Sequence, residues 1–173
     1  MLICLFLVVL IGLAGFGIKQ TKLYLPSKES KMALHPNPHE ATNFVLSGMD
    51  GQKYDLVKKG KPTIIHFWTS WCNSCKTELP MLQKKYEQYK DVVQFQMVNL
   101  TVDDHPDEVK KLMQKGQYHF PVLFDFSGEV GEGYQIVSIP TTYFVDQKGM
   151  IQKKVIGAMT ERQFDKLLSQ IQN

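Results

Sequence analysis

The stretch Trp71-Cys72-Asn73-Ser74-Cys75, followed directly by Lys76 to Pro80, determines the fold and the chemistry that we expect of this chain. Residues 63–68 before it are apolar and partly β-branched, which predicts a buried strand. Residues 73–89 have the pattern of a helix, and Pro80 inside it predicts a kink because proline lacks a backbone donor. Two cysteines separated by two residues at a helix start lie close enough to form a disulfide. The stretch therefore predicts a redox-active cysteine pair where a strand is followed by a helix.

Cys72 is placed at the amino-terminal end of the predicted helix. Unpaired amide groups and the helix dipole at this end favour a thiolate, which is the form that attacks disulfides. The alternative use of this spacing is half of a structural zinc site, which needs four ligands. The only other cysteine is Cys4, and it lies in an apolar N-terminal run. The pair is therefore predicted to be redox-active and to hold no metal.

The composition is that of a globular protein with one domain and an appendage. The 173 residues suffice for a sizeable core, and 43% hydrophobic and 21% charged residues are ordinary fractions. The net charge of +3 is small and dispersed, so it gives no reason to expect nucleic acid as a partner. Three cysteines do not make a disulfide scaffold, and the domain is expected to depend on its hydrophobic core.

The N-terminal residues 1–18 contain an uncharged apolar run and predict a membrane anchor or an export signal. No Lys or Arg precedes the run, whereas Lys19 and Lys22 follow it, so the positive-inside rule does not support a cytoplasmic N-terminus. Ala14 and the neighbouring glycines would permit cleavage, which would make the protein secreted. We favour an uncleaved single-pass anchor, with the remainder of the chain outside the cytoplasmic membrane.

Residues 19–41 are predicted to form a flexible tether, because they combine prolines and charges with no helical or strand period. His35 and His39 have the spacing of a metal pair on a helix, but two prolines between or beside them forbid that helix. They are expected to be solvated linker residues. The folded domain is predicted to span residues 42–173.

Residues 42–173 show strand patterns separated by helix patterns, starting with a hairpin that turns at Asp50-Gly51. The further expected elements are strands at 62–68, 92–100, 120–124, 141–145 and 150–156, and helices at 73–89, 106–115, 128–134 and after Thr160. A short turn joins the last two strands, which are therefore expected to be antiparallel. This order predicts an α/β domain with a mixed sheet.

Two segments resemble the thioredoxin fold. Residues 67–76, Phe-Trp-Thr-Ser-Trp-Cys-Asn-Ser-Cys-Lys, are similar to its active site, and Pro80 matches the kink that follows it. Ile139-Pro140-Thr141 resembles the cis-proline loop that lies against the active site in that family. The resemblance implies a domain whose cysteine pair and cis-proline loop together form the catalytic surface.

Three further features resemble the TlpA/ResA-like group of membrane-tethered thiol-disulfide oxidoreductases. They are the hairpin opened by residues 43–46, the segment Glu78-Leu79-Pro80, and an extra helix and strand at about 106–125. The resemblance spans residues 42–172. It implies a thioredoxin-like fold with an N-terminal β-hairpin, an extra αβ insertion and a mixed central sheet flanked by helices.

The resemblance also implies roles for three residues. Cys72 would be the attacking and more exposed thiol, and Cys75 would resolve the mixed disulfide and release the substrate. Glu78 occupies the position of a family glutamate thought to take the proton of the buried second cysteine. The alternative for Glu78 is an ordinary surface carboxylate on the first turns of a helix.

Four other residues complete the expected site. The resemblance implies that the backbone of Ile139 pairs with a substrate strand and that Pro140 is cis. We expect Trp71 to shape the apolar rim around the thiol. Trp68 is expected in the core. His66 departs from the family, since many thioredoxins have a buried aspartate at this position. We favour a neutral core histidine over a titrating proton relay.

The resemblance implies an enzyme, an extracytoplasmic thiol-disulfide oxidoreductase that reduces disulfides of exported partner proteins, such as apocytochrome c. The partners implied are protein thiols and disulfides, a membrane electron-donor protein and, through the anchor, the membrane itself. We expect a monomer without a resident cofactor.

Two alternatives remain open. The first is a thiol oxidase of the same fold, because Asn73-Ser74 between the cysteines matches neither well-known extreme of potential. The second is a copper-delivery protein, since related tethered folds hold copper with cysteines and a histidine. The wider cysteine spacing and the distal histidine of such proteins are not evident, which makes copper delivery the less favoured of the two.

Overall fold

A computed structural model describes residues 39–172 of the protein. The predicted anchor, residues 1–18, lies outside the described residues, as do His35 and all but the end of the predicted tether at 19–41. Within residues 39–172, no helix is both long and apolar enough to span a bilayer. The anchor therefore stays a prediction.

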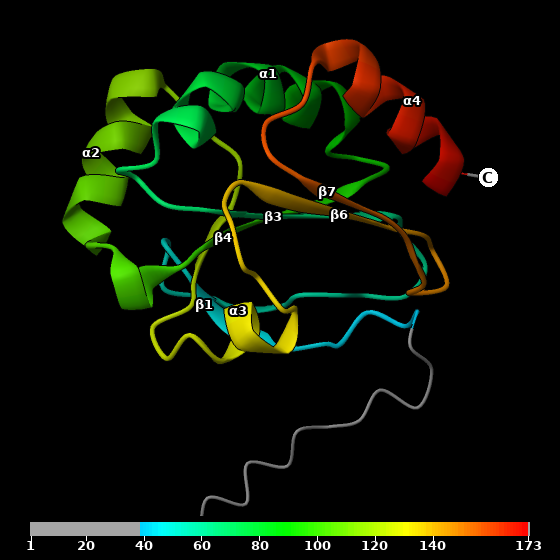
Figure 1. Ribbon diagram of the computed structural model, residues 1–173, viewed down its shortest axis with the longest axis horizontal. Coiled ribbons are helices and arrows are strands. Elements are labelled where there is room, and N and C mark those ends of the chain that lie inside the picture. Colours follow the sequence, from blue (N-terminus) through cyan, green and yellow to red (C-terminus); the bar gives the residue numbers. More distant parts are fainter. Residues whose placement is uncertain (1–38, 173) are drawn as a thin grey trace, which may run out of the picture. The chain divides into compact units, whose positions relative to one another are not determined.

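In the described part of the chain, seven strands form one mixed sheet in the order β2-β1-β5-β4-β3-β6-β7 (Figure 1). The strands are β1 (Val45–Gly48), β2 (Lys53–Asp55), β3 (Thr63–Trp68), β4 (Gln94–Asn99), β5 (Val122–Phe124), β6 (Thr141–Val145) and β7 (Ile151–Ile156). Strand β4 runs parallel to both β3 and β5, and the other neighbouring pairs are antiparallel. The predicted α/β class, the N-terminal hairpin and the antiparallel last pair are confirmed.

The helices described in residues 39–172 cover both faces of this sheet (Figure 1). They are α1 (Asn73–Tyr89), α2 (Pro106–Gly116), α3 (Glu129–Gly133) and α4 (Glu161–Ile171), with a 3-10 turn η1 (Thr101–Asp103). Side chains of α1, α2 and α4 pack into one hydrophobic cluster, and those of α3 pack into a second cluster on the opposite face. The helix α1 has the predicted bounds and contains Pro80.

Strand β3 is the centre of the fold, and all six of its residues are buried. Successive side chains of a strand point to opposite faces. Ile64 and Trp68 accordingly join the cluster beneath α1 and α4, whereas Ile65 and Phe67 join the cluster beneath α3. A strand covered on both faces explains the nearly continuous apolar run in its sequence. By the same alternation, His66 faces the side of α1.

The hairpin turn between β1 and β2 follows the predicted chemistry. Gly51 has a φ of 80°, a conformation that glycine adopts without the steric cost of a side chain. The Asp50 carboxylate accepts a hydrogen bond from the Gln52 amide at 3.0 Å. Asp50-Gly51 therefore turns the chain, and β1 pairs on its other side with β5.

The chain enters the domain beside the turn that joins β6 to β7. Glu40 forms an isolated antiparallel bridge with Met150, and the Ala41 amide donates to the Gly149 carbonyl at 2.9 Å. Paired backbone thus begins at residues 39–41, the last residues of the predicted tether. This turn lies at the end of the sheet where β3 begins, since β6 runs antiparallel to β3.

Candidate active site at the start of helix α1

Cys72 and Cys75 form a disulfide at the amino-terminal end of α1. Cys72 is the N-cap residue, where the chain changes from an extended to a helical backbone. Its sulfur accepts a hydrogen bond from the Cys75 amide at 3.1 Å and lies 3.3 Å from the Ser74 hydroxyl oxygen. In the reduced protein, these donors and the helix dipole favour a thiolate on Cys72.

The two sulfur-bearing residues differ in exposure. Cys72 is 6% exposed and Cys75 is fully buried. A disulfide of another protein can therefore reach only the first cysteine without opening the fold. This geometry gives Cys72 the expected place of the nucleophile and Cys75 that of the resolving thiol.

Glu78 lies one helical turn after Cys75, on the same buried face of α1. It is 3% exposed, so the alternative of a surface carboxylate is wrong. Its Oε1 accepts a hydrogen bond from the Met159 amide at 3.1 Å, whereas Oε2 has no hydrogen-bond partner among residues 39–172. Burial raises the pKa of this carboxyl to about 7, although the bond from Met159 acts in the opposite direction. A carboxyl with this pKa can accept and release a proton near neutral pH.

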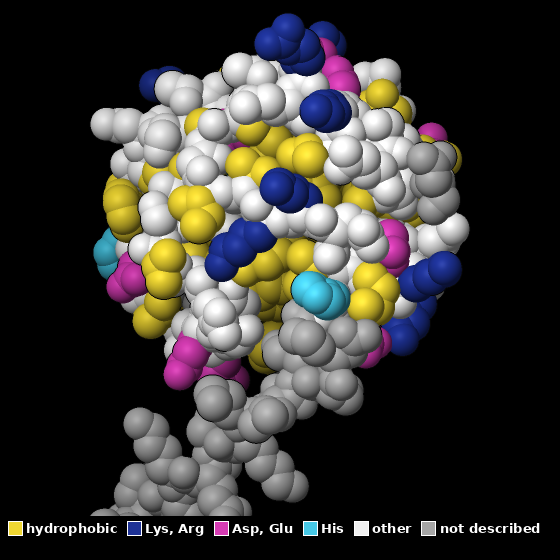
Figure 2. Space-filling model, turned by 45° about the vertical axis from the view of Figure 1, so that its right-hand side comes forward, with side chains coloured by type: hydrophobic (Ala, Val, Ile, Leu, Met, Phe, Trp, Pro, Cys, Tyr) yellow, Lys and Arg dark blue, Asp and Glu magenta, His cyan; other side chains and the backbone are white. Residues whose placement is uncertain are grey.

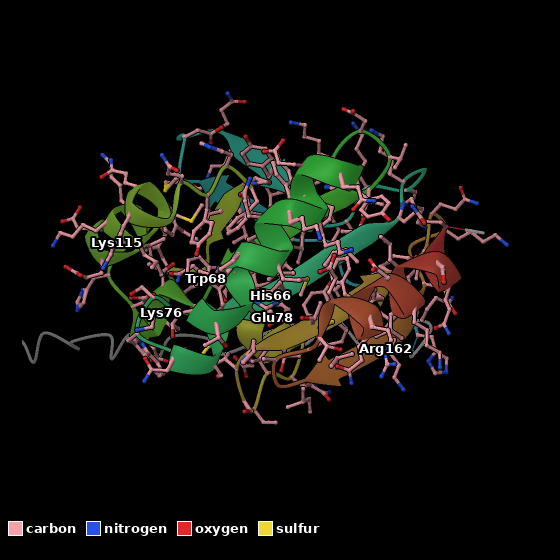
Figure 3. The ribbon with its side chains drawn as sticks, turned by 90° about the horizontal axis from the view of Figure 1, so that it is seen from above. His66, Trp68, Lys76, Glu78, Lys115 and Arg162 are labelled. Atoms are coloured by element: carbon pink, nitrogen blue, oxygen red, sulfur yellow. A yellow bond between two sulfur atoms is a disulfide. The ribbon has the colours of Figure 1, made fainter. Side chains whose placement is uncertain are left out.

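His66 lies on the same side of the sheet as Glu78, under α1 (Figure 3). It is fully buried, and its Nδ1 is 2.9 Å from the Thr142 hydroxyl oxygen. Burial lowers the pKa of the imidazole to about 3, which keeps the ring neutral at physiological pH. These observations favour the neutral core histidine over the titrating relay.

The two tryptophans occupy different environments, as expected. Trp68 is fully buried within the cluster under α1. Trp71 is 58% exposed directly before Cys72, and its Nε1 donates a hydrogen bond to the Asp103 carbonyl at 2.8 Å. Trp71 therefore presents an apolar surface to solvent beside the more accessible cysteine.

The peptide bond between Ile139 and Pro140 is cis, as the resemblance implied. Pro140 is buried, and Ile139 packs against the cluster that contains both cysteines. The Pro140 carbonyl accepts a hydrogen bond from the Gly157 amide at 2.8 Å, which fixes this loop to the end of β7. The loop and the cysteine pair therefore share one end of the sheet.

Asp104 is a residue of the site that sequence reasoning missed. It is 8% exposed, and its carboxylate accepts hydrogen bonds from the Ser70 amide and hydroxyl, the Asn99 side chain and the His105 amide. These bonds are 2.5 to 2.8 Å long. The carboxylate thus fixes the loop just before Trp71 and Cys72. The only sequence signal was an aspartate shortly before Pro106, which is typical of a helix start.

Among residues 39–172, no group of three or more His, Cys, Asp or Glu side chains is arranged to hold a metal ion. His39 is exposed at the domain entrance, and His119 is an exposed residue whose amide donates to the Gln83 side chain at 2.7 Å.

Comparisons with known proteins agree with this geometry. A model of the AhpC/TSA family matches residues 38–154. The thiol-disulfide oxidoreductase ResA of Bacillus cereus is 31% identical over 166 residues, which cover 95% of this chain and 92% of ResA. The sporulation thiol-disulfide oxidoreductase A of Bacillus subtilis is 37% identical over 122 residues, which cover 69% of this chain and 74% of that protein. The crystal structure of StoA from Bacillus subtilis superposes with a TM-score of 0.67 at 35% identity, and the match covers 75% of this chain and 98% of StoA.

Proposed function

Because the chain belongs to the AhpC/TSA family of thioredoxin-like proteins and is a thiol-disulfide oxidoreductase, we propose that it reduces disulfides of exported proteins outside the cytoplasmic membrane. The observation that carries the proposal is the buried Glu78 carboxyl, placed one helical turn from the buried Cys75. A reductase must re-form its own disulfide to release each product. Glu78 provides the proton acceptor that this step requires.

In the first step, the Cys72 thiolate attacks one sulfur of the substrate disulfide. A bond forms between Cys72 Sγ and that sulfur, and the other substrate sulfur leaves as a thiolate that takes a proton from solvent. The Cys75 amide and the Ser74 hydroxyl stabilise the thiolate before attack. The product of this step is a mixed disulfide between enzyme and substrate.

In the second step, the Cys75 thiol gives its proton to Glu78 and attacks Cys72 Sγ. The Cys72–Cys75 disulfide re-forms and the second substrate sulfur leaves as a thiolate. Two electrons have then passed from the enzyme dithiol to the substrate. Burial makes the Cys75 thiol resist deprotonation, so a carboxylate with a pKa of about 7 is suited to this transfer.

Substrate contacts are assigned to the two sides of Cys72. The backbone of Ile139, before cis Pro140, pairs with an extended substrate segment, and Trp71 forms an apolar rim against it. His66 is assigned a structural role as a neutral core residue.

Residues 1–18 anchor the chain, residues 19–41 tether the catalytic domain on the extracytoplasmic side, and a membrane protein returns electrons to the disulfide. Haem-site cysteines of apocytochrome c are the substrate class that the family resemblance suggests. The supports are the apolar N-terminal run and the similarity to ResA.

The test is the reduction potential of the Cys72/Cys75 pair, measured by equilibrating the chain in mild detergent with glutathione buffers. We expect a value near that of thioredoxin, about −270 mV. A value near about −120 mV would instead identify a thiol oxidase and overturn the proposed direction.

A further inference from the structure

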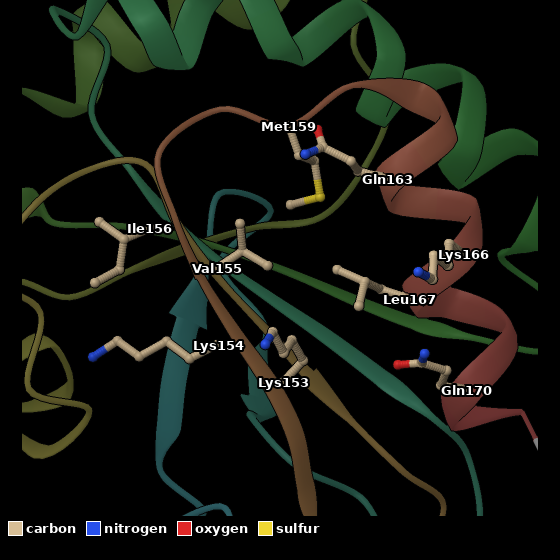
Figure 4. A pocket seen from close by; sticks show the side chains of 9 residues that line it. All are labelled: Lys153, Lys154, Val155, Ile156, Met159, Gln163, Lys166, Leu167 and Gln170. Atoms are coloured by element: carbon tan, nitrogen blue, oxygen red, sulfur yellow. The ribbon is translucent and has the colours of Figure 1, made fainter.

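A groove of about 540 Å³ lies between β7 and α4 (Figure 4). Val155, Met159 and Leu167 form its apolar floor. Figure 2 shows, on one face of the domain, apolar side chains gathered between basic side chains. The groove lies outside the catalytic site described above. Met159 connects the two, because its side chain lines the groove and its amide donates a hydrogen bond to Glu78.

The charged side chains that line the groove are all positive. Among the described residues that line it, three are lysines and none is Asp or Glu. The acidic residues of α4 point elsewhere, because Glu161 and Asp165 pair with the buried Lys85 of α1 at 3.0 and 2.5 Å. The side of α4 that faces the groove therefore carries no compensating negative charge.

Two of the three lysines are available to a ligand. Lys154 donates to the Gln135 carbonyl at 3.0 Å and lies over the ring of Tyr143. Lys153 and Lys166 have no ion pair or side-chain hydrogen bond within the described residues. They flank the apolar floor from β7 and from α4 respectively (Figure 4).

Strand β7 is the edge of the sheet, and β6 is its only neighbouring strand in the described part of the chain. The Gly157 amide bonds to the Pro140 carbonyl, and the register continues from there along β6. Backbone groups alternate in an antiparallel pair, so the N–H and C=O groups of Ile156 and Lys154 point away from β6. The edge thus offers the backbone N–H and C=O groups of two residues, two positions apart, to an added strand.

We propose that this groove docks an extended, acidic segment of the protein substrate, which adds to β7 as an eighth strand and places carboxylates between Lys153 and Lys166. The proposal rests on the proposed function and names a class of substrate for it. Lysines on an edge strand oppose pairing with a second basic edge, which disfavours two copies of this chain meeting here. An acidic strand removes that repulsion and supplies the missing partners. Because the same segment leads through Gly157 to Met159, a docked strand lies next to the catalytic end of the sheet.

The test uses two synthetic peptides that carry the same intramolecular disulfide and differ in a six-residue arm, alternating Asp-Val in one and Lys-Val in the other. With the full chain at low salt, we expect the Asp-Val peptide to be reduced with a kcat/KM about fivefold higher. The preference should shrink as salt rises, because exposed charge pairs are screened. Combined Lys153→Glu and Lys166→Glu should reverse the preference. Combined Lys110→Glu and Lys115→Glu, the same total charge change at exposed positions of α2, should keep it.

A third peptide tests the strand geometry. It has the Asp-Val arm with N-methyl groups on alternate residues, which remove the amides that would pair with β7. Loss of the preference with this peptide supports an added strand, and full retention overturns it.

Other results separate the possible failures. Equal kcat/KM for the two arms, with glutathione disulfide still reduced, would overturn docking and leave the proposed function intact. Failure to reduce any disulfide would remove the proposed function itself. Dimerisation in sedimentation, or binding to phosphatidylglycerol vesicles, that depends on Lys153 and Lys166 without any peptide preference would assign the groove to a second copy or to a membrane.

Discussion

Asp104 and Glu78 are two buried carboxyl groups near the cysteine pair, and their hydrogen bonds suit them to different functions. Asp104 uses both oxygens to accept hydrogen bonds from four donors, two of them on Ser70 in the loop just before Cys72. Glu78 has one hydrogen bond, from the Met159 amide, and an oxygen without a partner among residues 39–172. A satisfied carboxylate fixes the position of the loop, whereas an incompletely satisfied one has a raised pKa and can carry a proton.

The most severe test of this comparison removes the cysteines in turn. We expect Cys72→Ser to abolish exchange, and Cys75→Ser to accumulate mixed disulfides with substrate, visible on non-reducing gels. If Glu78 acts only on Cys75, adding Glu78→Gln to Cys75→Ser should leave the rate of mixed-disulfide formation unchanged. Trapping by Cys72→Ser would reverse the assigned roles of the two thiols.

The next largest effect is expected from Glu78→Gln alone. Loss of the proton acceptor should slow re-formation of the disulfide at pH 7 by about 100-fold. The rate should recover as pH rises, when hydroxide can deprotonate Cys75. Stopped-flow measurement of substrate release against pH checks this, with Glu87→Gln on the exposed face of α1 as the matched control. An unchanged pH profile would make Glu78 a bystander.

Asp104→Ala should affect stability more than proton transfer. The variant leaves the half-buried donors of Ser70 and the buried amide of Asn99 without their acceptor, which should cost about 2 to 4 kcal/mol of unfolding free energy. Urea denaturation measures this loss. The pH dependence of turnover should stay that of the wild type, and a shifted profile would mean that the two carboxyls are not separate in function.

The smallest expected effect is a pH dependence of stability from Glu78. Its pKa in the folded state is about 7 against an ordinary 4.5, so the folded state binds this proton more tightly than the unfolded state. The stabilisation is complete below pH 4.5 and is lost as pH rises through 7. Relative to Glu78→Gln, the wild type should lose roughly 1 to 3 kcal/mol over this range. Parallel stability curves for the two proteins would contradict the raised pKa.

The local patterns of the sequence predicted the frame of the site well. The bounds of α1 and β6 and the position of Cys72 at a helix start were correct, because strand periods, the Cys-x-x-Cys spacing and the apolar face of α1 are local signals. The same face of α1 contains Glu78, since Cys75, Glu78 and Leu79 follow helical spacing. The burial of Glu78 therefore also follows from a local signal, the helical spacing of this apolar face.

The long-range contacts could not be predicted in this way. Asp104 binds Ser70 across 34 residues of sequence, and the Met159 amide reaches Glu78 across 81. Neither pairing has a periodic or compositional signal, because each depends on how β4 and α4 are placed against α1. For the same reason, the groove beside β7 followed only from the order of strands in the sheet.

The entry of the chain beside Met150 has a mechanical consequence. This entry point lies at the pole of the domain where β3 begins, and the cysteines lie at the opposite pole, roughly 20 Å away along the six residues of the strand. A domain attached through that pole has its reactive end farthest from the point of attachment. If residues before 39 attach to a bilayer, an electron donor within that membrane would reach the cysteines only after the domain has reoriented.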